Sequence, residues 1–227
     1  MRTILFDIDG TLLFSGGAGR RAMTLAFRDV YGLEDGFAGI SMSGKTDAQI
    51  LREALLRAGL PLEERSAALF RQRYFEHLRS TMNDQAPGKR LVPGVNQLLE
   101  ALRVRGGVLL GLLTGNWRES AYIKLRRFGI DHFFPFGAFA DDSEDRNALL
   151  PVAIRRAESL ARRQLEAADV WIVGDTPRDV ECGSVHGVKV LGVASGEYGP
   201  EVLAAAGATA VVRDFRDVQA VLGILLA

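Results

Sequence analysis

The stretch Thr-Ile-Leu-Phe-Asp-Ile-Asp-Gly-Thr, residues 3–11, runs from a short apolar segment into two acidic residues and a Gly-Thr turn. Positions two apart in a strand lie on the same side, so we expect Asp7 and Asp9 to lean into one site where the strand ends. Like charges held that close repel each other, and such a pair persists where a cation or an acid–base step requires it. The alternative is a turn with solvated acids, and this stretch alone does not decide between the two.

Beyond residue 90, short apolar runs alternate with amphipathic segments. Continuous apolar strands that alternate with helices are typical of a parallel sheet covered on both faces. The sequence therefore predicts an α/β fold with a doubly wound, mostly parallel sheet, a Rossmann-like core. The expected strands are residues 108–113, 136–140, 170–173, 188–193 and 210–212, and the expected helices are about 117–128, 146–161, 178–186 and 218–226.

Residues 15–87 interrupt this alternation, because their apolar positions recur only at helical spacing. A glycine-rich segment at 16–19 provides a flexible entry, and residues 85–88, which include a proline and a glycine, provide an exit. We expect a helical insertion directly after the first strand, with the core formed by residues 1–14 and 88–227. The alternative is that these helices simply pack on the sheet.

Composition limits the classes of partner. The 227 residues carry 28 Lys+Arg and 28 Asp+Glu, so no global field attracts nucleic acid or an anionic membrane. The single cysteine, Cys182, excludes an internal disulfide and fits a reducing compartment. The N-terminus does not read as a signal peptide, and the longest apolar run, 108–113, is far too short to span a bilayer. We expect a cytoplasmic protein with a small-molecule partner, and the sequence does not specify its oligomeric state.

Three further segments place polar residues after expected strands, where doubly wound sheets bind ligands. Thr114, Gly115 and Asn116 lead into a helix whose backbone N–H groups suit an anion such as phosphate; an ordinary helix cap is the alternative. Residues 174–179 hold two carboxylates four apart at a helix start, where capping is the alternative. Residues 141–146 are acidic apart from Ser143 and the basic Arg146, and a solvated loop is the alternative there.

Together, residues 7–11, 113–116 and 174–179 resemble three signature motifs of the haloacid dehalogenase-like hydrolase superfamily, in the family's order. The resemblance covers nearly the whole chain and includes a helical cap, residues 15–87, inserted after the first motif. One motif departs, because the family usually places a lysine where Arg146 is the best candidate here. An arginine can still balance phosphate and carboxylate charge through two parallel hydrogen bonds.

The resemblance implies a phosphoryl transfer that uses Mg²⁺. Asp7 would be the nucleophile and form an aspartyl-phosphate, while Asp9 would protonate the leaving oxygen and later deprotonate the attacking water. The metal would bind the Asp7 carboxylate, the Asp9 carbonyl and Asp175, with Asp179 acting through a metal-bound water or against Arg146.

The remaining roles concern the phosphate and the substrate. By resemblance, Thr114 and neighbouring amides, including that of Gly115, would hold the phosphoryl group with help from Asn116. Arg146 would neutralise charge on the nucleophile and on the phosphate. Residues 43–47 resemble a cap loop of the phosphoglycolate phosphatase and β-phosphoglucomutase groups. Arg20 and Lys45 in the cap are candidates for substrate contact, with solvated charge as the alternative.

The second acid of the first motif narrows the reaction. The dehalogenase branch lacks an acid at the position of Asp9, and the phosphonate-cleaving branch has a small residue there. We therefore predict a phosphatase of small phosphorylated metabolites, with phosphoglycolate-like or sugar phosphates as the leading substrates. The alternatives are a phosphomutase of the β-phosphoglucomutase type and a non-catalytic regulatory protein, the latter favoured only by Arg146 in place of lysine.

Overall fold

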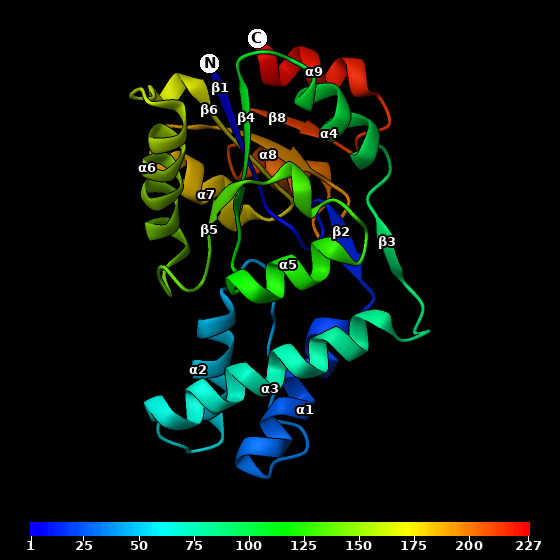
Figure 1. Cartoon of the computed structure of the whole chain (residues 1–227), viewed down its shortest axis with the longest axis vertical. Helices are drawn as coiled ribbons and strands as arrows, with labels where there is room; N and C mark the ends of the chain where they lie inside the picture. Colours follow the sequence, from blue (N-terminus) through cyan, green and yellow to red (C-terminus); the bar gives the residue numbers. More distant parts are fainter.

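The computed structural model describes all 227 residues and contains a six-stranded sheet in the order β5-β4-β1-β6-β7-β8 (Figure 1). All neighbouring strands pair in parallel, which confirms the predicted doubly wound α/β fold. The order places β1 in the interior of the sheet, so its carboxyl end has a strand on each side. The bounds are β1 (Arg2–Phe6), β4 (Val108–Leu113), β5 (Phe136–Ala138), β6 (Val170–Gly174), β7 (Lys189–Val193) and β8 (Ala210–Val212).

Helices cover both faces of the sheet because each strand alternates its apolar side chains between two clusters. Ile4 and Phe6 of β1 point into the first cluster, and Leu5 points into the second. The first is closed by α4 (Val95–Arg103), α5 (Arg118–Arg126) and α9 (Val218–Leu226). The second is closed by α6 (Leu149–Ala161), α7 (Pro177–Val185) and α8 (Pro200–Ala205).

Most of the expected elements agree with the structure, and the differences lie in element ends and in short elements. The strand expected at 136–140 ends at Ala138, and the helix expected from 146 begins as a 3₁₀ turn at Arg146–Ala148 before α6. The helices α4 and α8 and the strands β2 (Leu13–Ser15) and β3 (Lys89–Leu91) are not among the expected elements. Since β2 and β3 have only three residues each, neither provides an apolar run long enough to identify a strand.

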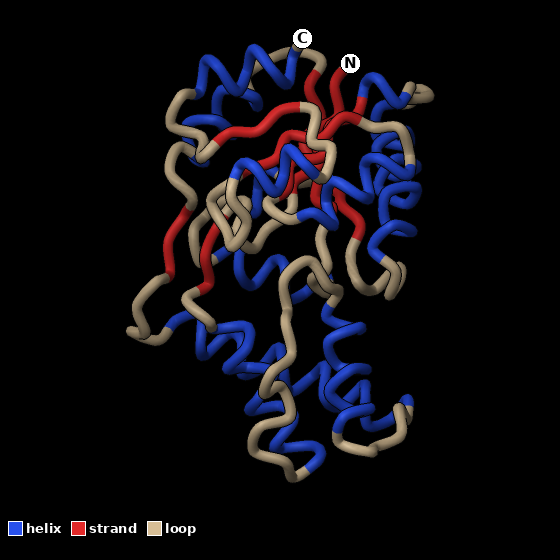
Figure 2. The backbone as a smooth tube through the Cα atoms, turned by 180° about the vertical axis from the view of Figure 1, so that it is seen from behind, coloured by secondary structure: helices blue, strands red, loops and turns tan.

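The helices α1 (Ala18–Tyr31), α2 (Asp47–Arg57) and α3 (Glu64–Asn83) form a helical insert beyond the carboxyl ends of the strands (Figures 1 and 2). They bury an aromatic cluster of their own that includes Phe27, Phe70 and Tyr74, and Trp117 of the core packs against it. The chain enters and leaves through β2 and β3, which pair antiparallel. The division into a core of 1–14 and 88–227 and a cap of 15–87 stays a prediction.

The helical insert is seated on the loops that follow β4 and β5. The Asp47 N–H donates to the Gly115 carbonyl at 2.7 Å, and the Thr46 hydroxyl donates to the Glu144 carbonyl at 2.9 Å. Arg52 adds two bonds to the Glu144 carboxylate, at 2.6 and 2.8 Å. A Cβ at Gly115 would lie 2.2 Å from the Lys45 carbonyl oxygen, so only glycine allows this approach. The insert therefore covers the carboxyl ends of the strands, where the predicted site lies.

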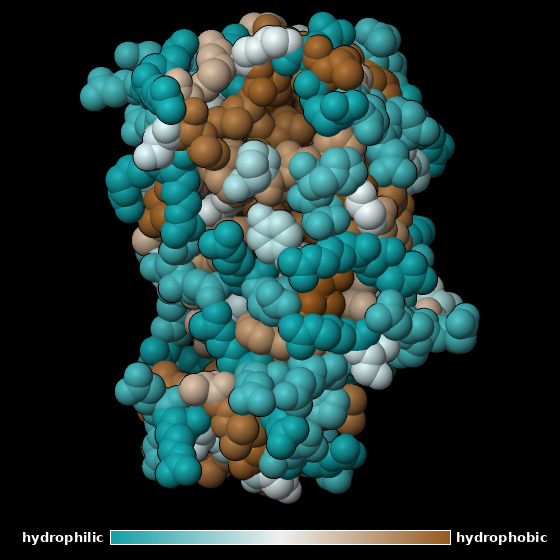
Figure 3. All heavy atoms as spheres, viewed as in Figure 1, coloured by the Kyte–Doolittle hydropathy of each residue, from teal (hydrophilic) through white to brown (hydrophobic).

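The face of the molecule in Figure 3 is mostly hydrophilic, with apolar side chains gathered over the sheet between α6 and α4. None of the helices combines the length and the apolar character that crossing a bilayer requires. Cys182 is buried in the cluster closed by α6 and α7, as expected of a small core residue. The cytoplasmic location stays a prediction.

Candidate active site

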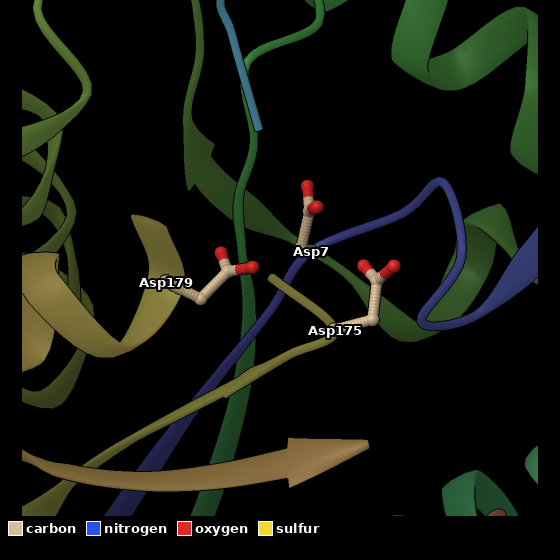
Figure 4. A group of neighbouring side chains, drawn as sticks. All are labelled: Asp7, Asp175 and Asp179. Carbon is tan, nitrogen blue, oxygen red and sulfur yellow. The ribbon is translucent and has the colours of Figure 1, made fainter. Parts of the chain in front are cut away.

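Three carboxylates meet at the carboxyl ends of β1 and β6. Phe6 pairs with Val173 across these neighbouring strands, so the residues that follow, Asp7 and Asp175, come out side by side. Asp179 lies in the first turn of α7, directly after β6. Figure 4 shows the three carboxyl groups around a common space, and one oxygen of each lies within 4.8 Å of the others. The structure thus brings together three of the four residues predicted to bind metal.

The three carboxylates of this cluster are buried, and the positive charge near them does not balance their negative charge. Burial, with a further contribution from Asp179, raises the pKa of Asp7 to about 6, although Arg146 acts in the opposite direction. Burial and the charges of Asp179 and Asp7 raise the pKa of Asp175 to about 8. Each shift means that the negative charge costs free energy where it stands, as expected of a site that lacks a cation.

Arg146 is the one basic side chain in contact with this cluster. It is buried, its Nη2 lies 3.4 Å from Asp7 Oδ2, and it donates a hydrogen bond to Asp179. Burial lowers the pKa of the guanidinium, but the carboxylates of Asp179 and Asp7 outweigh this and raise it. Its Nε is buried without a hydrogen-bond partner. Arg146 thus contacts Asp7 of the first motif and Asp179 of the third, at the place where the resemblance leads us to expect a lysine.

The donor set fits Mg²⁺. Hard divalent cations take carboxylate and carbonyl oxygens, and the cluster offers three buried carboxylates against one arginine. Asp179 accepts from the Thr176 N–H and hydroxyl at 3.0 and 2.8 Å as well as from Arg146, so both its oxygens are engaged. Asp175 has one oxygen bonded to Thr11 at 3.0 Å. Glycines at 10 and 196 leave room beside it, because a Cβ at either would lie 2.1 or 2.0 Å from Asp175 Oδ2.

Asp9 lines the same cavity, but its carboxylate has different partners. Its Oδ2 accepts from Asn116 Nδ2 at 2.9 Å and from Lys124 Nζ at 2.5 Å. Its side chain is 41% exposed, whereas the acids of the cluster are buried. Asn116 Nδ2 also donates to Thr114 Oγ1 at 2.8 Å, so the second motif binds the first through this amide. The two aspartates of residues 3–11 therefore face two different sets of groups.

These residues surround a cavity of about 310 Å³ between the sheet edge and the helical insert. That volume suits a small ligand, since drug-sized sites start at about 300 Å³. Thr114 and Asp179 are buried and lie outside the lining, whereas the other predicted site residues line it. The lining includes Asp7, Asp9, Gly115, Asn116, Arg146 and Asp175 from the core and Arg20, Lys45 and Tyr74 from the insert.

This arrangement can be compared with known proteins. Residues 4–193 match the family model described as haloacid dehalogenase-like hydrolase. The chain belongs to the haloacid dehalogenase-like hydrolase family. The family resemblance of the three motifs is therefore confirmed.

Curated relatives match this hydrolase over most of its length. The phosphoglycolate phosphatase of Synechococcus elongatus is 28% identical over 91% of this chain and 90% of its own length. The phosphoglycolate phosphatase of Rhodospirillum rubrum is 29% identical over 94% of this chain and 88% of its own length. The predicted enzyme class, a phosphoric monoester hydrolase of the haloacid dehalogenase-like family, is confirmed at the level of the class.

Solved structures share the fold of this family member. A hydrolase from Pseudomonas syringae superposes with a TM-score of 0.73 at 20% identity and covers 99% of both chains. CbbY from Rhodobacter sphaeroides, solved in complex with phosphate, gives 0.70 at 20% identity over 96% of both chains. At this identity the likeness supports the fold, and it extends over the helical insert as well as the sheet.

The two substrate candidates of this hydrolase differ in how their charge is used. Arg20 donates to the carbonyls of Phe37 and Ile40 at 2.8 and 2.7 Å and pairs with no carboxylate. Lys45 forms an ion pair with Glu53, which neutralises it within the insert. Both line the cavity, but only Arg20 brings unbalanced positive charge to it.

Sequence reasoning missed Lys124, whose ammonium reaches into the cavity from α5. The side chain is buried, although lysine is almost never buried unless it is paired. A signal was present, because Lys124 lies three residues after Ala121 and four before Phe128, on the apolar stripe of the expected helix.

Proposed function

We propose that the protein is a Mg²⁺-dependent phosphatase that hydrolyses small phosphorylated metabolites through an aspartyl-phosphate on Asp7. One observation carries the proposal. The Asp7 carboxylate opens into a small cavity with two further buried carboxylates within 4.8 Å and a guanidinium 3.4 Å away. A phosphate ester is an anion that repels a carboxylate nucleophile. Attack therefore requires positively charged groups beside both the carboxylate and the phosphate.

In the first step, an oxygen of Asp7 attacks phosphorus while the bond from phosphorus to the leaving oxygen breaks. The electron pair of that bond goes to the leaving oxygen, and Asp9 supplies the proton. In the second step, water attacks the phosphorus of the aspartyl-phosphate and gives its proton to Asp9. The bond to Asp7 breaks, inorganic phosphate leaves, and both aspartates return to their starting states.

The chain's own groups hold the phosphoryl group. Arg146 is bonded to Asp179 through Nη2 and lies 3.4 Å from Asp7, so its positive charge stands beside the position where the phosphoryl group is attacked. The N–H groups around Gly115 lie between β4 and α5, where helix N-termini favour anions. Thr114 does not line the cavity, but its hydroxyl oxygen accepts a hydrogen bond from the Asn116 amide and so holds that side chain in place.

Mg²⁺, when bound, would offset the repulsion between the nucleophile and the phosphate. The Asp7 and Asp175 carboxylates and the Asp9 carbonyl would hold it. Asp179 would act one step further out, because its oxygens are already bonded to Thr176 and Arg146.

The substrate class follows from the insert. We assign to the helical insert, residues 15–87, the role of a cap, since its side chains line the cavity that holds the nucleophile. Of the two cap cations that line the cavity, Arg20 has no acidic partner, so it suits a second anionic group on the substrate better than Lys45 does. A carboxylate on the leaving group fits, as in the phosphoglycolate that names the curated relatives. Sugar phosphates are the other candidates.

The first experiment measures Mg²⁺-dependent phosphate release from 4-nitrophenyl phosphate. The wild type should turn over only with Mg²⁺, and Asp7→Asn should lose activity by a factor on the order of 10³ or more because it lacks the nucleophile. Asp35→Asn, which changes an exposed acid outside the cavity, is the matched control. Absent turnover in the wild type, or equal turnover in Asp7→Asn, would contradict the proposal and favour the regulatory alternative.

A panel of phosphoglycolate, hexose phosphates and glycerol phosphate then tests the substrate class. Arg20→Met should raise KM about 10-fold for the carboxylate-bearing ester and leave glycerol phosphate nearly unchanged, as expected for a lost ion pair. Arg21→Met is the control, since Arg21 pairs with Asp84 away from the cavity. Equal effects of Arg20→Met on both esters would exclude Arg20 as the selecting residue.

A phosphomutase is the second candidate, because the seated insert gives the cavity the cover that such an enzyme needs against water. The two activities separate in one assay of hexose monophosphates. Release of inorganic phosphate without an added bisphosphate supports the phosphatase. Isomerisation of the hexose phosphate that depends on a bisphosphate supports the mutase.

A further inference from the structure

Lys124 is a buried lysine that none of the three motifs contains. It lies in α5, only 4% exposed, with its ammonium in the cavity wall. Burying an ammonium costs several kcal/mol unless close partners compensate it. Its partners are Asp9 Oδ2 at 2.5 Å and Asn116 Oδ1 at 2.6 Å, so the ammonium is directed at two residues that line the cavity.

The three side chains form a closed set of hydrogen bonds. Lys124 donates to Asp9 and to the Asn116 carbonyl oxygen, and the Asn116 amide donates to the same Asp9 oxygen at 2.9 Å. The amide is fixed in turn by its bond to Thr114 Oγ1 at 2.8 Å. Lys124 therefore determines which way Asn116 turns as well as where the Asp9 carboxylate lies.

Both donors bind the same carboxylate oxygen, Oδ2. The other oxygen, Oδ1, makes no hydrogen bond within the chain. A carboxyl group with its proton on Oδ1 still accepts two bonds at Oδ2, so the clamp persists in both states of the acid. The arrangement holds Asp9 by one oxygen and leaves the other to exchange a proton.

We propose that Lys124 is a positioning residue which, with Asn116, clamps Asp9 by Oδ2 so that Oδ1 delivers the proton to the leaving oxygen. This inference rests on the proposed phosphatase function. The balance is simple: the proton leaves Oδ1, the leaving oxygen takes it as its bond to phosphorus breaks, and the proton of the attacking water later returns to Oδ1. Lys124 itself exchanges no proton and touches no reacting atom.

The charge of Lys124 also acts to lower the pKa of Asp47, but the hydrogen bonds of its ammonium go to Asp9 and Asn116. Asp47 is the other buried acid on this side, yet it accepts from the Trp117 N–H and from Ser120 Oγ, both at 2.9 Å. No salt bridge joins Asp47 to Lys124 within 4.0 Å. The ammonium therefore bonds Asp9 and not Asp47, although both aspartates line the cavity.

The test compares two leaving groups in Lys124→Met, which keeps the length of the side chain and removes its charge. An alkyl phosphate needs a proton on its leaving oxygen, whereas 4-nitrophenolate leaves without one. A general acid contributes about 10²–10⁴-fold, so we expect kcat/KM for glycerol phosphate to fall roughly 10- to 100-fold and that for 4-nitrophenyl phosphate by less than about threefold. Arg126→Met, on the exposed side of the same helix, is the matched control.

Equal losses with both esters would overturn the inference, because a damaged fold or a lost substrate contact makes no distinction between leaving groups. No loss with either ester would overturn it as well. In an Asp9→Asn background, Lys124→Met should cause no further loss with glycerol phosphate, and an additive loss would count against a role through Asp9.

Two controls separate a loss of folding, or a failure of the proposed function, from the effect of Lys124. Circular dichroism and thermal unfolding establish that Lys124→Met is folded, and Lys124→Gln carries the same comparison if it is not. The proposed function fails separately, since in that case the wild type hydrolyses neither ester.

Discussion

The two sides of the cavity are built on opposite charge balances. On the metal side, Asp7, Asp175 and Asp179 face a single cation, Arg146, and the pKa values of Asp7 and Asp175 are raised. On the proton side, Asp9 alone faces the ammonium of Lys124. The first side is short of positive charge and the second is not. The difference indicates where an added cation belongs and where the chain supplies its own.

The two sides also differ in how the fold assembles them. Two neighbouring parallel strands and the turn after β6 create the metal side, so its acids are fixed by the sheet. A helix creates the proton side, because α5 carries Lys124 and the loop before it carries Asn116. The proton side should therefore tolerate substitution with less damage to the fold. The following experiments test that contrast.

The largest effect is expected from Asp175→Asn on the metal side. Removing this charge should lower kcat on the order of 10²- to 10³-fold, because metal-assisted charge stabilisation supplies several kcal/mol. The variant should also lose the Mg²⁺-dependent rise in melting temperature. Steady-state kinetics and thermal unfolding at several Mg²⁺ concentrations measure both. A variant that keeps its Mg²⁺ response would place the metal elsewhere.

Arg146→Met should be the most destabilising substitution of a cavity cation. It leaves Asp7 and Asp179 buried without their arginine, and loss of one partner of a buried pair costs about 3–5 kcal/mol. Urea unfolding without Mg²⁺ measures the change. Arg163→Met, which breaks an exposed pair with Asp169, should cost at most about 1 kcal/mol. Equal costs would mean that burial does not distinguish the two pairs.

Mg²⁺ should stabilise the protein more at pH 8.5 than at pH 5.5. Without metal, the raised pKa values of Asp7, about 6, and Asp175, about 8, make the folded state hold protons that the unfolded state releases. Stability therefore falls as pH rises from about 4 to about 8, and Mg²⁺ competes best once those protons have left. At 100 times its dissociation constant, Mg²⁺ adds about 2.7 kcal/mol, or roughly 5–10 °C in melting temperature at this size.

The same measurement separates the two sides. Lys124→Met should retain the Mg²⁺ response, because its clamp lies on the proton side. A Mg²⁺ shift of equal size at both pH values would contradict the metal-side assignment.

The smallest effect is expected from Asp47→Asn, at the start of α2 in the insert. Burial raises the pKa of this carboxyl to about 6, although the charge of Lys124 and the hydrogen bonds from Trp117 and Ser120 act to lower it. Its contribution is fully present below pH 3.8 and is lost as pH rises towards about 6. Asparagine keeps an acceptor for Trp117 and Ser120 without ionising. Relative to wild type, the variant should therefore gain on the order of 1–3 kcal/mol between pH 4 and pH 8 in urea unfolding. A difference that is independent of pH would show that the carboxyl is not desolvated.

Apolar runs and motif order predicted much of this molecule. The strand at 108–113 and the last helix at 218–226 have the expected bounds, because long apolar runs locate buried elements directly, and the short strand at 210–212 also has the expected bounds. The helix α2 begins at Asp47, within the segment 43–47 that resembles a cap loop, and Thr46 caps it. Neighbouring strands of a parallel sheet then place Asp7 beside Asp175.

The rest depends on contacts between distant residues. The pair β2–β3 joins residues whose own sequence, Lys-Arg-Leu in β3, has no strand pattern. The docking of Asp47 on Gly115 depends on how the insert lies on the core. Lys124 lies on the apolar stripe of its helix, but no local pattern reveals that its partner is Asp9.

The paired strands β2 and β3 make the insert an exchangeable module. Ser15 stands opposite Lys89, and a Cβ at Gly16 would lie 2.4 Å from the Pro87 carbonyl oxygen, so both ends of the segment meet at one place. A tight turn between these strands would replace the whole segment without moving β1 or β4. On the proposed cap role, selectivity and reaction chemistry would lie in separable pieces of one chain, and a graft at Ser15 and Lys89 is the cut that would exchange one without the other.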